Sequence, residues 1–188
     1  MKINAFANYQ ELNGDAYLMD YTQATKSLQK VCITQTVPKD ITFFHLSNPR
    51  KISYWAVNFE ENEAVLKGSD QCECMFAASK ASSKGWVCLV ELKYCLEKNI
   101  ESNSEHAFQQ LHKTLEKLVE KEILDYHSHR IYLNISIPEH SHRTPFTAFQ
   151  NSQDELLNML KEHKVKVLGY NEALILNEGF IKVPKEEI

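Results

Sequence analysis

Two charged residues stand at the end of an otherwise apolar stretch of this chain. The run Trp86-Val87-Cys88-Leu89-Val90 is followed by Glu91, Leu92 and Lys93. Five apolar residues without alternation are typical of a central strand that is covered on both faces. Side chains two residues apart on a strand project from the same face. We therefore expect the Glu91 carboxylate and the Lys93 ammonium to lie side by side. Pairing is expected because a charged group is costly to bury without a partner.

A second acid, Glu73, lies in the preceding apolar segment, 72–78. If this segment pairs with the strand over 86–94 as a hairpin, Glu73 comes alongside Glu91, whereas its competitor Asp70 stays in the turn. Two converging carboxylates suit a hard divalent cation such as Mg²⁺ or Mn²⁺. Such a metal polarises a phosphoryl oxygen and lowers the pKa of a bound water, and a nearby lysine stabilises developing charge. Glu73, Glu91 and Lys93 would suffice for phosphodiester hydrolysis.

The elements that must position these residues follow from the pattern after residue 52. It predicts, in order, three strands, a helix, a strand, a second helix and a strand, over 52–59, 72–78, 86–94, 104–123, 130–137, 154–163 and 165–169. This order predicts an α/β (α+β) chain with a central mixed sheet flanked by helices. Shorter extended segments follow at 173–176 and 180–183.

The first fifty residues give a weaker pattern. They predict a helix over 17–28 and extended segments over 31–36 and 41–45. The chain holds only five Gly and five Pro, and no stretch has the composition of a linker. We therefore predict one domain over residues 1–188.

These residues resemble the core of the PD-(D/E)XK nucleases, the restriction-endonuclease-like superfamily. The resemblance rests on Cys72-Glu73-Cys74-Met75-Phe76, a short polar gap, Val90-Glu91-Leu92-Lys93, and a helix carrying Ala107-Phe108-Gln109-Gln110-Leu111. The family pattern is an acid on one strand, E-x-K on the next, and often a glutamine on the following helix. The match covers about residues 52–137, with extensions at both ends of the chain.

The resemblance implies a role for each matching residue. Glu73 and Glu91 would bind Mg²⁺ or Mn²⁺, Lys93 would be the catalytic lysine, and Gln110, in preference to Gln109, would be the helix glutamine. The implied function is a metal-dependent phosphodiesterase that acts on nucleic acid, as a DNA nuclease. Many members of the superfamily are dimers, so the resemblance also implies a homodimer.

Two departures from the family pattern leave alternatives open. The first acid is usually Asp with a Pro shortly before it, but here it is Glu73 with no Pro nearby. The family also often carries an acid on an N-terminal helix, for which Glu11, Glu61 and Glu63 are candidates. One alternative is therefore a catalytically degenerate nuclease-like module that binds or assembles. Another is a small α/β protein in which the E-x-K pair is purely structural.

Composition and charge narrow the class of protein. A net charge of −4 argues against coating nucleic acid non-specifically, although it allows a local basic groove. No apolar run approaches the roughly 18 residues of a membrane helix, and residues 1–8 lack the apolar stretch of a secretory signal, so we expect a cytoplasmic protein without a membrane partner. The five cysteines are expected to be reduced thiols, and the Cys72/Cys74 pair is a weaker candidate for a metal site.

Histidines flank the predicted strand 130–137 at both ends: His127, His129, His140 and His142. H-x-H pairs can bind transition metals, but because these pairs lie at opposite ends of one strand, exposed loop positions are the favoured interpretation. A separate hypothesis is that Arg130, His142 and Arg143 contact phosphate near the site.

Overall fold

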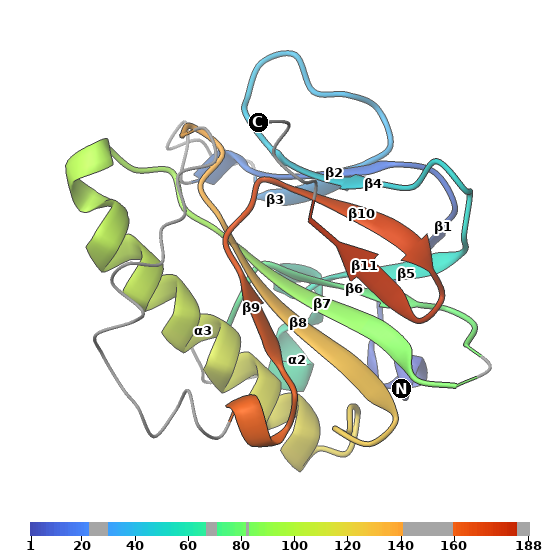
Figure 1. Ribbon diagram of the computed structural model, residues 1–188. Helices are drawn as coiled ribbons and strands as arrows, with labels where there is room; N and C mark the ends of the chain where they lie inside the picture. Colours follow the sequence, from blue (N-terminus) through green and yellow to red (C-terminus); the bar gives the residue numbers. More distant parts are fainter. Residues whose placement is uncertain (23–29, 67–70, 82, 141–159, 184–188) are drawn as a thin grey trace.

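The structure is a computed structural model that describes residues 1–22, 30–66, 71–81, 83–140 and 160–183 (Figure 1). Its layers are a long helix, a six-stranded sheet and a five-stranded sheet. The long helix is α3 (Ile100–Glu120). The shorter helical elements are η1 (Ile3–Ala5), η2 (Glu60–Asn62), α2 (Glu63–Leu66) and η3 (Glu97–Asn99).

The six-stranded sheet is mixed. Its strands, in spatial order, are β1 (Gln10–Leu12), β5 (Tyr54–Asn58), β6 (Cys74–Ala78), β7 (Gly85–Leu92), β8 (His129–Ser136) and β9 (Lys166–Leu168). The pairs from β1 to β7 are antiparallel, whereas β7–β8 and β8–β9 are parallel. The predicted hairpin between the segments 72–78 and 86–94 is confirmed.

The parallel pair β7–β8 requires a crossover connection, and α3 provides it. Apolar residues at three- and four-residue spacings in α3 form one stripe that is buried against the sheet: Ala107, Phe108, Leu111, Leu115 and Leu118. The helix therefore covers the face of the sheet that carries Met75, Val87 and Leu89 (Figure 1).

The five-stranded sheet joins both ends of the chain. Its spatial order is β11 (Phe180–Lys182), β10 (Glu172–Asn177), β4 (Phe44–Ser47), β2 (Ala16–Asp20) and β3 (Val31–Thr34). The N-terminal strand β4 pairs in parallel with the C-terminal strand β10. The segments before and after residues 52–137 thus build one shared sheet.

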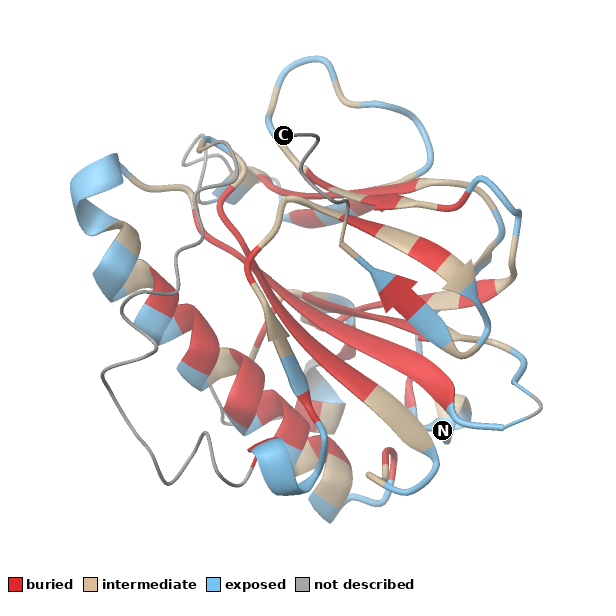
Figure 2. Cartoon of the chain, in the orientation of Figure 1, coloured by how far each residue is buried: buried red, intermediate tan, exposed pale blue. Residues whose placement is uncertain are grey.

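Two apolar cores separate the three layers (Figure 2). All eight residues of β7 are buried, because its side chains alternate between the two cores. Val87 and Leu89 lie in the core beneath α3, and Trp86, Cys88 and Val90 lie in the core between the sheets. The absence of alternation in this run, predicted to mark a doubly covered strand, is explained by these two cores.

The predictions of the mixed sheet and of the strands after residue 52 are confirmed, but two expectations need correction. The sheet is not flanked by helices on both faces: α3 covers one face, and the second β-sheet covers the other. Residues 17–20 are strand β2 rather than helix. Every residue of β2 is buried, and a fully buried strand shows no alternation that would distinguish it from a buried helix.

Parts of the two predicted helices over 17–28 and 154–163 fall on residues that the structure does not describe. Residues 21–22 of the helix predicted over 17–28 are helical, whereas residues 23–28 of it lie outside the described residues. Residues 154–159 of the helix predicted over 154–163 also lie outside the described residues. Residues 160–162 are helical. In the part of the chain that the structure describes, no helix combines the length and apolar character needed to cross a membrane.

Candidate active site

Glu91 and Lys93 meet at the carboxyl end of β7. The Lys93 ammonium donates a hydrogen bond to Glu91 Oε1 at 2.5 Å, which is also a salt bridge. Both residues are buried, with 0% and 6% of their surface exposed. The backbone N–H of Lys93 donates to the Ser136 carbonyl of β8 at 2.9 Å, which fixes the residue just past the end of the strand. The expectation that these two side chains share one face is confirmed.

Gln110 reaches the same point from α3. The Lys93 ammonium donates to Gln110 Oε1 at 2.7 Å. The amide nitrogen of Gln110 in turn donates to the Gln71 carbonyl at 3.1 Å, so its orientation is fixed by contacts on both sides. Gln109 is exposed on the outer side of the helix. Of the two glutamines considered, the structure places Gln110 beside Lys93.

Thr114 ties this part of α3 to the start of β6. Its hydroxyl donates to the Gln110 carbonyl one turn earlier at 2.8 Å, and it accepts the backbone N–H of Cys72 at 2.9 Å. Thr114 is fully buried. This hydroxyl therefore sets the helix relative to the segment that carries Glu73.

Glu73 lies immediately before β6 and opposite Glu91. Cys74 pairs with Val90 and Met75 with Leu89, and extending this antiparallel register by one residue sets Glu73 across from Glu91. The backbone N–H of Glu73 also stabilises the charged form of Glu91, lowering the pKa of that carboxyl. Glu73 itself is half-buried. The two acids thus lie on neighbouring segments, as the hairpin prediction requires.

The structure adds an acid that sequence reasoning missed, Asp20 at the end of β2. Its negative charge acts on both Glu73 and Glu91 and raises the pKa of each. Asp20 is buried. Its backbone N–H donates to the hydroxyl of Tyr94, the residue that follows Lys93 in the chain, at 3.4 Å. A usable signal was present, because Asp20 ends an apolar segment just as Glu91 does. The expectation that residues 17–20 are helical, which is wrong, concealed it.

The electrostatics of the site are those of crowded, buried acids. Burial raises the pKa of Glu91 to about 7, while the charge and hydrogen bond of Lys93 oppose this shift. Burial also raises the pKa of Glu73 well above its usual range, and the negative charges of Glu91 and Asp20 add to this effect. One lysine thus faces more negative charge than it neutralises, which is a setting that favours a bound cation.

The donor set fits a hard divalent cation in part. Glu91 Oε2 is buried and has no hydrogen-bond partner among the described residues, so an acceptor is available beside Glu73. Within the described ranges, no three His, Cys, Asp or Glu side chains form a group that could hold a metal ion. The chain would therefore provide the two carboxylates, and water or substrate would complete the coordination, as is usual for Mg²⁺.

The other candidate acids do not join this cluster or cannot be placed. Glu11 and Glu61 are exposed, and neither is among the main charges acting on Glu73 or Glu91. The side chain of Glu63, and all of Asp70, lie outside the described residues. Glu60, which was not a candidate, does raise the pKa of Glu73.

Of the histidines and basic residues named for β8, the structure places His129, His140 and Arg130 away from Glu91 and Lys93. His129 lies at the start of β8, where its ring contacts the Asp125 carbonyl, whereas His140 lies beyond the end of β8 and contacts the Cys95 carbonyl. Arg130 pairs in register with Trp86, five residues from the position opposite Glu91. The hypothesis that Arg130 contacts phosphate near Glu91 is therefore wrong, because five residues of β8, at about 3.3 Å each, separate Arg130 from the position opposite Glu91. His142 and Arg143 lie outside the described residues.

The five cysteines are free thiols, as expected. Cys72 belongs to the core beneath α3 and Cys74 to the core between the sheets. The two sulfurs therefore face different layers and do not form the metal pair that their spacing suggested.

Comparison of the chain with protein-family models, with curated proteins and with solved structures finds no match.

Proposed function

We propose that this chain is a metal-dependent nuclease with a PD-(D/E)XK type core, which hydrolyses phosphodiester bonds in nucleic acid, with DNA as the first substrate to test. One observation carries the proposal: Lys93 contacts both Glu91 and Gln110, and Glu73 lies opposite Glu91. The order of the elements supports it as well. The acid precedes β6, E-x-K ends β7 and the glutamine lies on α3, before β8.

Each side chain has a distinct task in this proposal. Glu73 and Glu91 would hold Mg²⁺ or Mn²⁺, which when bound polarises a phosphoryl oxygen and makes water more acidic. Lys93 offers its positive charge to the scissile phosphate or to the attacking water. An ammonium has three donors, and the contacts described for Lys93 use two of them. Gln110, anchored on the Gln71 carbonyl, holds the ammonium in place.

A second candidate is a catalytically degenerate nuclease-like module that binds or assembles. The observation that favours it is the burial of the ion pair: Glu91 is fully buried and Lys93 is nearly so. A buried ion pair can be retained for its structural role alone. The two candidates differ in their response to metal and in whether there is an activity to lose.

The deciding experiment is cleavage of supercoiled plasmid and of single-stranded DNA by the purified chain in Mg²⁺ or Mn²⁺. We expect metal-dependent cleavage that falls by about 10²-fold or more in Lys93→Ala, the loss typical for one charge-stabilising donor. Gln110→Ala should also lose activity, while its neighbour Gln109→Ala serves as the matched control and should retain it.

The possible outcomes separate the candidates. Because removing Lys93 leaves a buried acid unpaired, circular dichroism must first show that the variant is folded, and half-buried Glu73→Gln provides a milder second test. Equal cleavage by the wild type and by a folded Lys93→Ala variant would exclude the proposed site. Absence of cleavage by the wild type with every substrate and metal would favour the degenerate module.

A further inference from the structure

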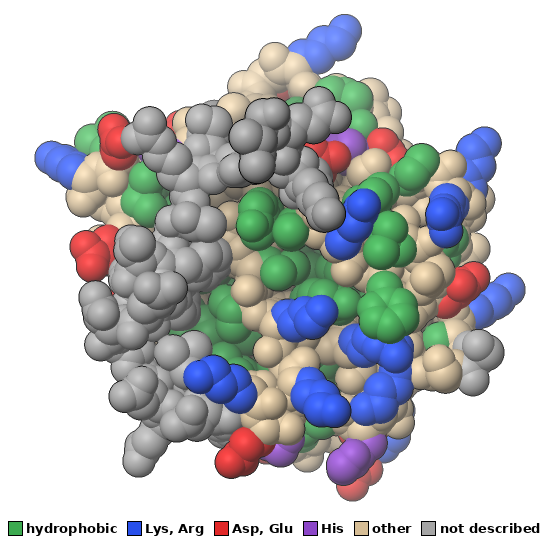
Figure 3. Space-filling model, viewed as in Figure 1, with side chains coloured by type: hydrophobic (Ala, Val, Ile, Leu, Met, Phe, Trp, Pro, Cys, Tyr) green, Lys and Arg blue, Asp and Glu red, His purple; other side chains and the backbone are tan. Residues whose placement is uncertain are grey.

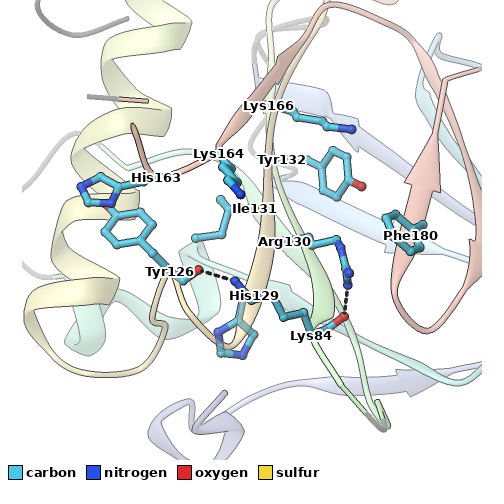
Figure 4. A pocket seen from close by; sticks show the side chains of 10 residues that line it. All are labelled: Lys84, Tyr126, His129, Arg130, Ile131, Tyr132, His163, Lys164, Lys166 and Phe180. Carbon is cyan, nitrogen blue, oxygen red and sulfur yellow. Dashed lines mark hydrogen bonds between the residues drawn. The ribbon is translucent and has the colours of Figure 1, made fainter. Parts of the chain in front are cut away.

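A pocket of about 380 Å³ opens at the opposite end of the parallel strands (Figure 4). Four cations line it, namely Lys84, Arg130, Lys164 and Lys166. Aromatic rings stand on either side of these cations, with Tyr126 on one side and Phe180 on the other. Its volume lies within the range of small-ligand sites in proteins, about 300–1,000 Å³.

The pocket is distinct from the candidate active site. It adjoins the first residues of β7 and β8, where Gly85 pairs with His129, whereas Glu91 pairs with Ile135. Six residues along β7, at about 3.3 Å each, place the two sites about 20 Å apart. The nuclease proposal makes no use of the basic residues at this end.

The charge of the pocket is of one sign. None of the ten described residues that line it is Asp or Glu, although the whole chain has a net charge of −4. Asp125 approaches His129 at 3.7 Å, but its carboxylate also accepts the backbone N–H groups of His127 and Ser128. Like charges gathered around a hollow repel one another unless an anion joins them. Figure 3 shows Lys and Arg side chains grouped on this face.

Arg130 is held in one orientation. Its Nη1 donates to the Lys84 carbonyl at 2.6 Å and approaches the Gly179 carbonyl at 3.4 Å. Its guanidinium carbon lies 4.0 Å from the centre of the Phe180 ring. Among the described contacts only Nη1 is used, so Nε and Nη2 are available to a ligand. A guanidinium fixed in this way offers a plane on which a flat group can stack.

The rings of the pocket can accept a planar group. Phe180 is 42% exposed although it is a large apolar side chain. On the other side, the rings of Tyr126 and His163 stack with centroids 4.1 Å apart. Aromatic and guanidinium planes are the surfaces on which proteins stack unpaired bases. Cations beside aromatic rings therefore point to a ligand with both a phosphate and a base.

We propose that this pocket binds one nucleotide, with its phosphate among Lys84, Lys164 and Lys166 and its base against Phe180 and Arg130. The nucleotide is either a free mononucleotide or one unit of a single strand. In a strand, the distance to Glu91 would correspond to about six nucleotides at about 3.4 Å each. Binding as part of a strand extends the proposed function, whereas binding of a free nucleotide does not depend on it.

The test measures binding in EDTA, so that cleavage cannot interfere. Fluorescence anisotropy of a fluorescein-labelled dT12 oligonucleotide is recorded with the wild type and with Lys84→Ala/Lys166→Ala, whose two positions are exposed. In the double variant we expect the Kd to rise at least tenfold. We also expect the negative slope of log K against log salt to become shallower by about 1.4, because two phosphate contacts are lost. Lys39→Ala, an exposed lysine between β3 and β4, is the control and should leave both unchanged.

A second variant and a competition test the base and the source of the nucleotide. Phe180→Ala should weaken binding at least about fivefold if a base stacks there. Displacement of the oligonucleotide by AMP would support one site that binds both a free mononucleotide and one unit of a strand. Direct AMP binding by calorimetry without oligonucleotide binding identifies the free nucleotide. Oligonucleotide binding that AMP fails to displace, yet that the double variant weakens, identifies a strand.

The proposal is overturned by equal Kd values for the wild type and the double variant, or by inorganic phosphate competing as well as AMP. It is also overturned if neither AMP nor dT12 binds. Cleavage in Mn²⁺ is assayed in parallel with the same proteins. Pocket binding without cleavage of any substrate in either metal would count against the nuclease proposal alone, and cleavage without pocket binding would refute this inference alone.

Discussion

Replacing Glu91 with glutamine should change how the stability of the protein depends on pH. Burial raises the pKa of Glu91 from its ordinary value of 4.5 to about 7 in the folded chain. Between these two values the folded state keeps a proton that the unfolded state has released. Stability therefore falls as the pH rises through this window, and the loss is complete above the folded pKa.

The magnitude follows from the two pKa values. Their difference, at about 1.36 kcal/mol per pKa unit, corresponds to about 3 kcal/mol. The amide introduced by Glu91→Gln cannot ionise, so the variant lacks this loss. The free energy of unfolding of Glu91→Gln minus that of the wild type should therefore increase by about 3 kcal/mol between pH 4.5 and pH 8. The neighbouring acid Glu73 adds to the same trend, because a neutral side chain at position 91 no longer raises its pKa.

The assay is urea unfolding at several pH values in EDTA, followed by circular dichroism. Only the change in the difference with pH is diagnostic, because the substitution also alters packing and the partner of Lys93 by a pH-independent amount. Glu105→Gln, on the exposed side of α3, is the matched control and should give a flat difference. If the Glu91→Gln difference were also flat, Glu91 would have an ordinary pKa, and the argument for a charge-crowded site would fail.

Two further predictions concern the support of the site and its metal. Thr114→Val should lower the free energy of unfolding by about 1–3 kcal/mol, because it leaves the buried N–H of Cys72 without an acceptor; Thr114→Ser keeps the hydroxyl and should lose less in the same urea titration. Mn²⁺ should raise the Tm of the wild type more at pH 8 than at pH 6, because at the lower pH the metal must displace a proton from Glu91. An equal rise in Glu91→Gln would show that Mn²⁺ binds elsewhere.

Much of the architecture could be predicted from sequence because its signals are local. The apolar run that ends in Glu91 identified a doubly covered strand, and the apolar spacing from Ala107 to Leu118 identified α3. The two-residue spacing of Glu91 and Lys93 predicted their contact. Each of these inferences needs only the period of one element and no knowledge of what packs against it.

The second sheet could not be predicted, because its pairings are not local. β4 pairs with β10 across more than a hundred residues, and nothing in either short segment specifies its partner. The same limit hid Asp20. Its approach to Glu73 and Glu91 depends on how β2 is placed by β3 and β4, not on its neighbours in the chain. Residues brought to a site by long-range pairing carry no spacing signal.

The placement of charge resolves the strongest compositional objection to nucleic-acid binding. A net charge of −4 is unfavourable for a protein that meets phosphates over its whole surface. Here the acids that act on one another, Asp20, Glu73 and Glu91, gather at one end of the parallel strands, and the pocket cations gather at the other. The acidic end would repel a phosphate until a divalent cation is bound there. Binding of nucleic acid without metal should therefore depend on the basic end, and its cleavage on the acidic end. Separate variants of one protein can thus test the two sites.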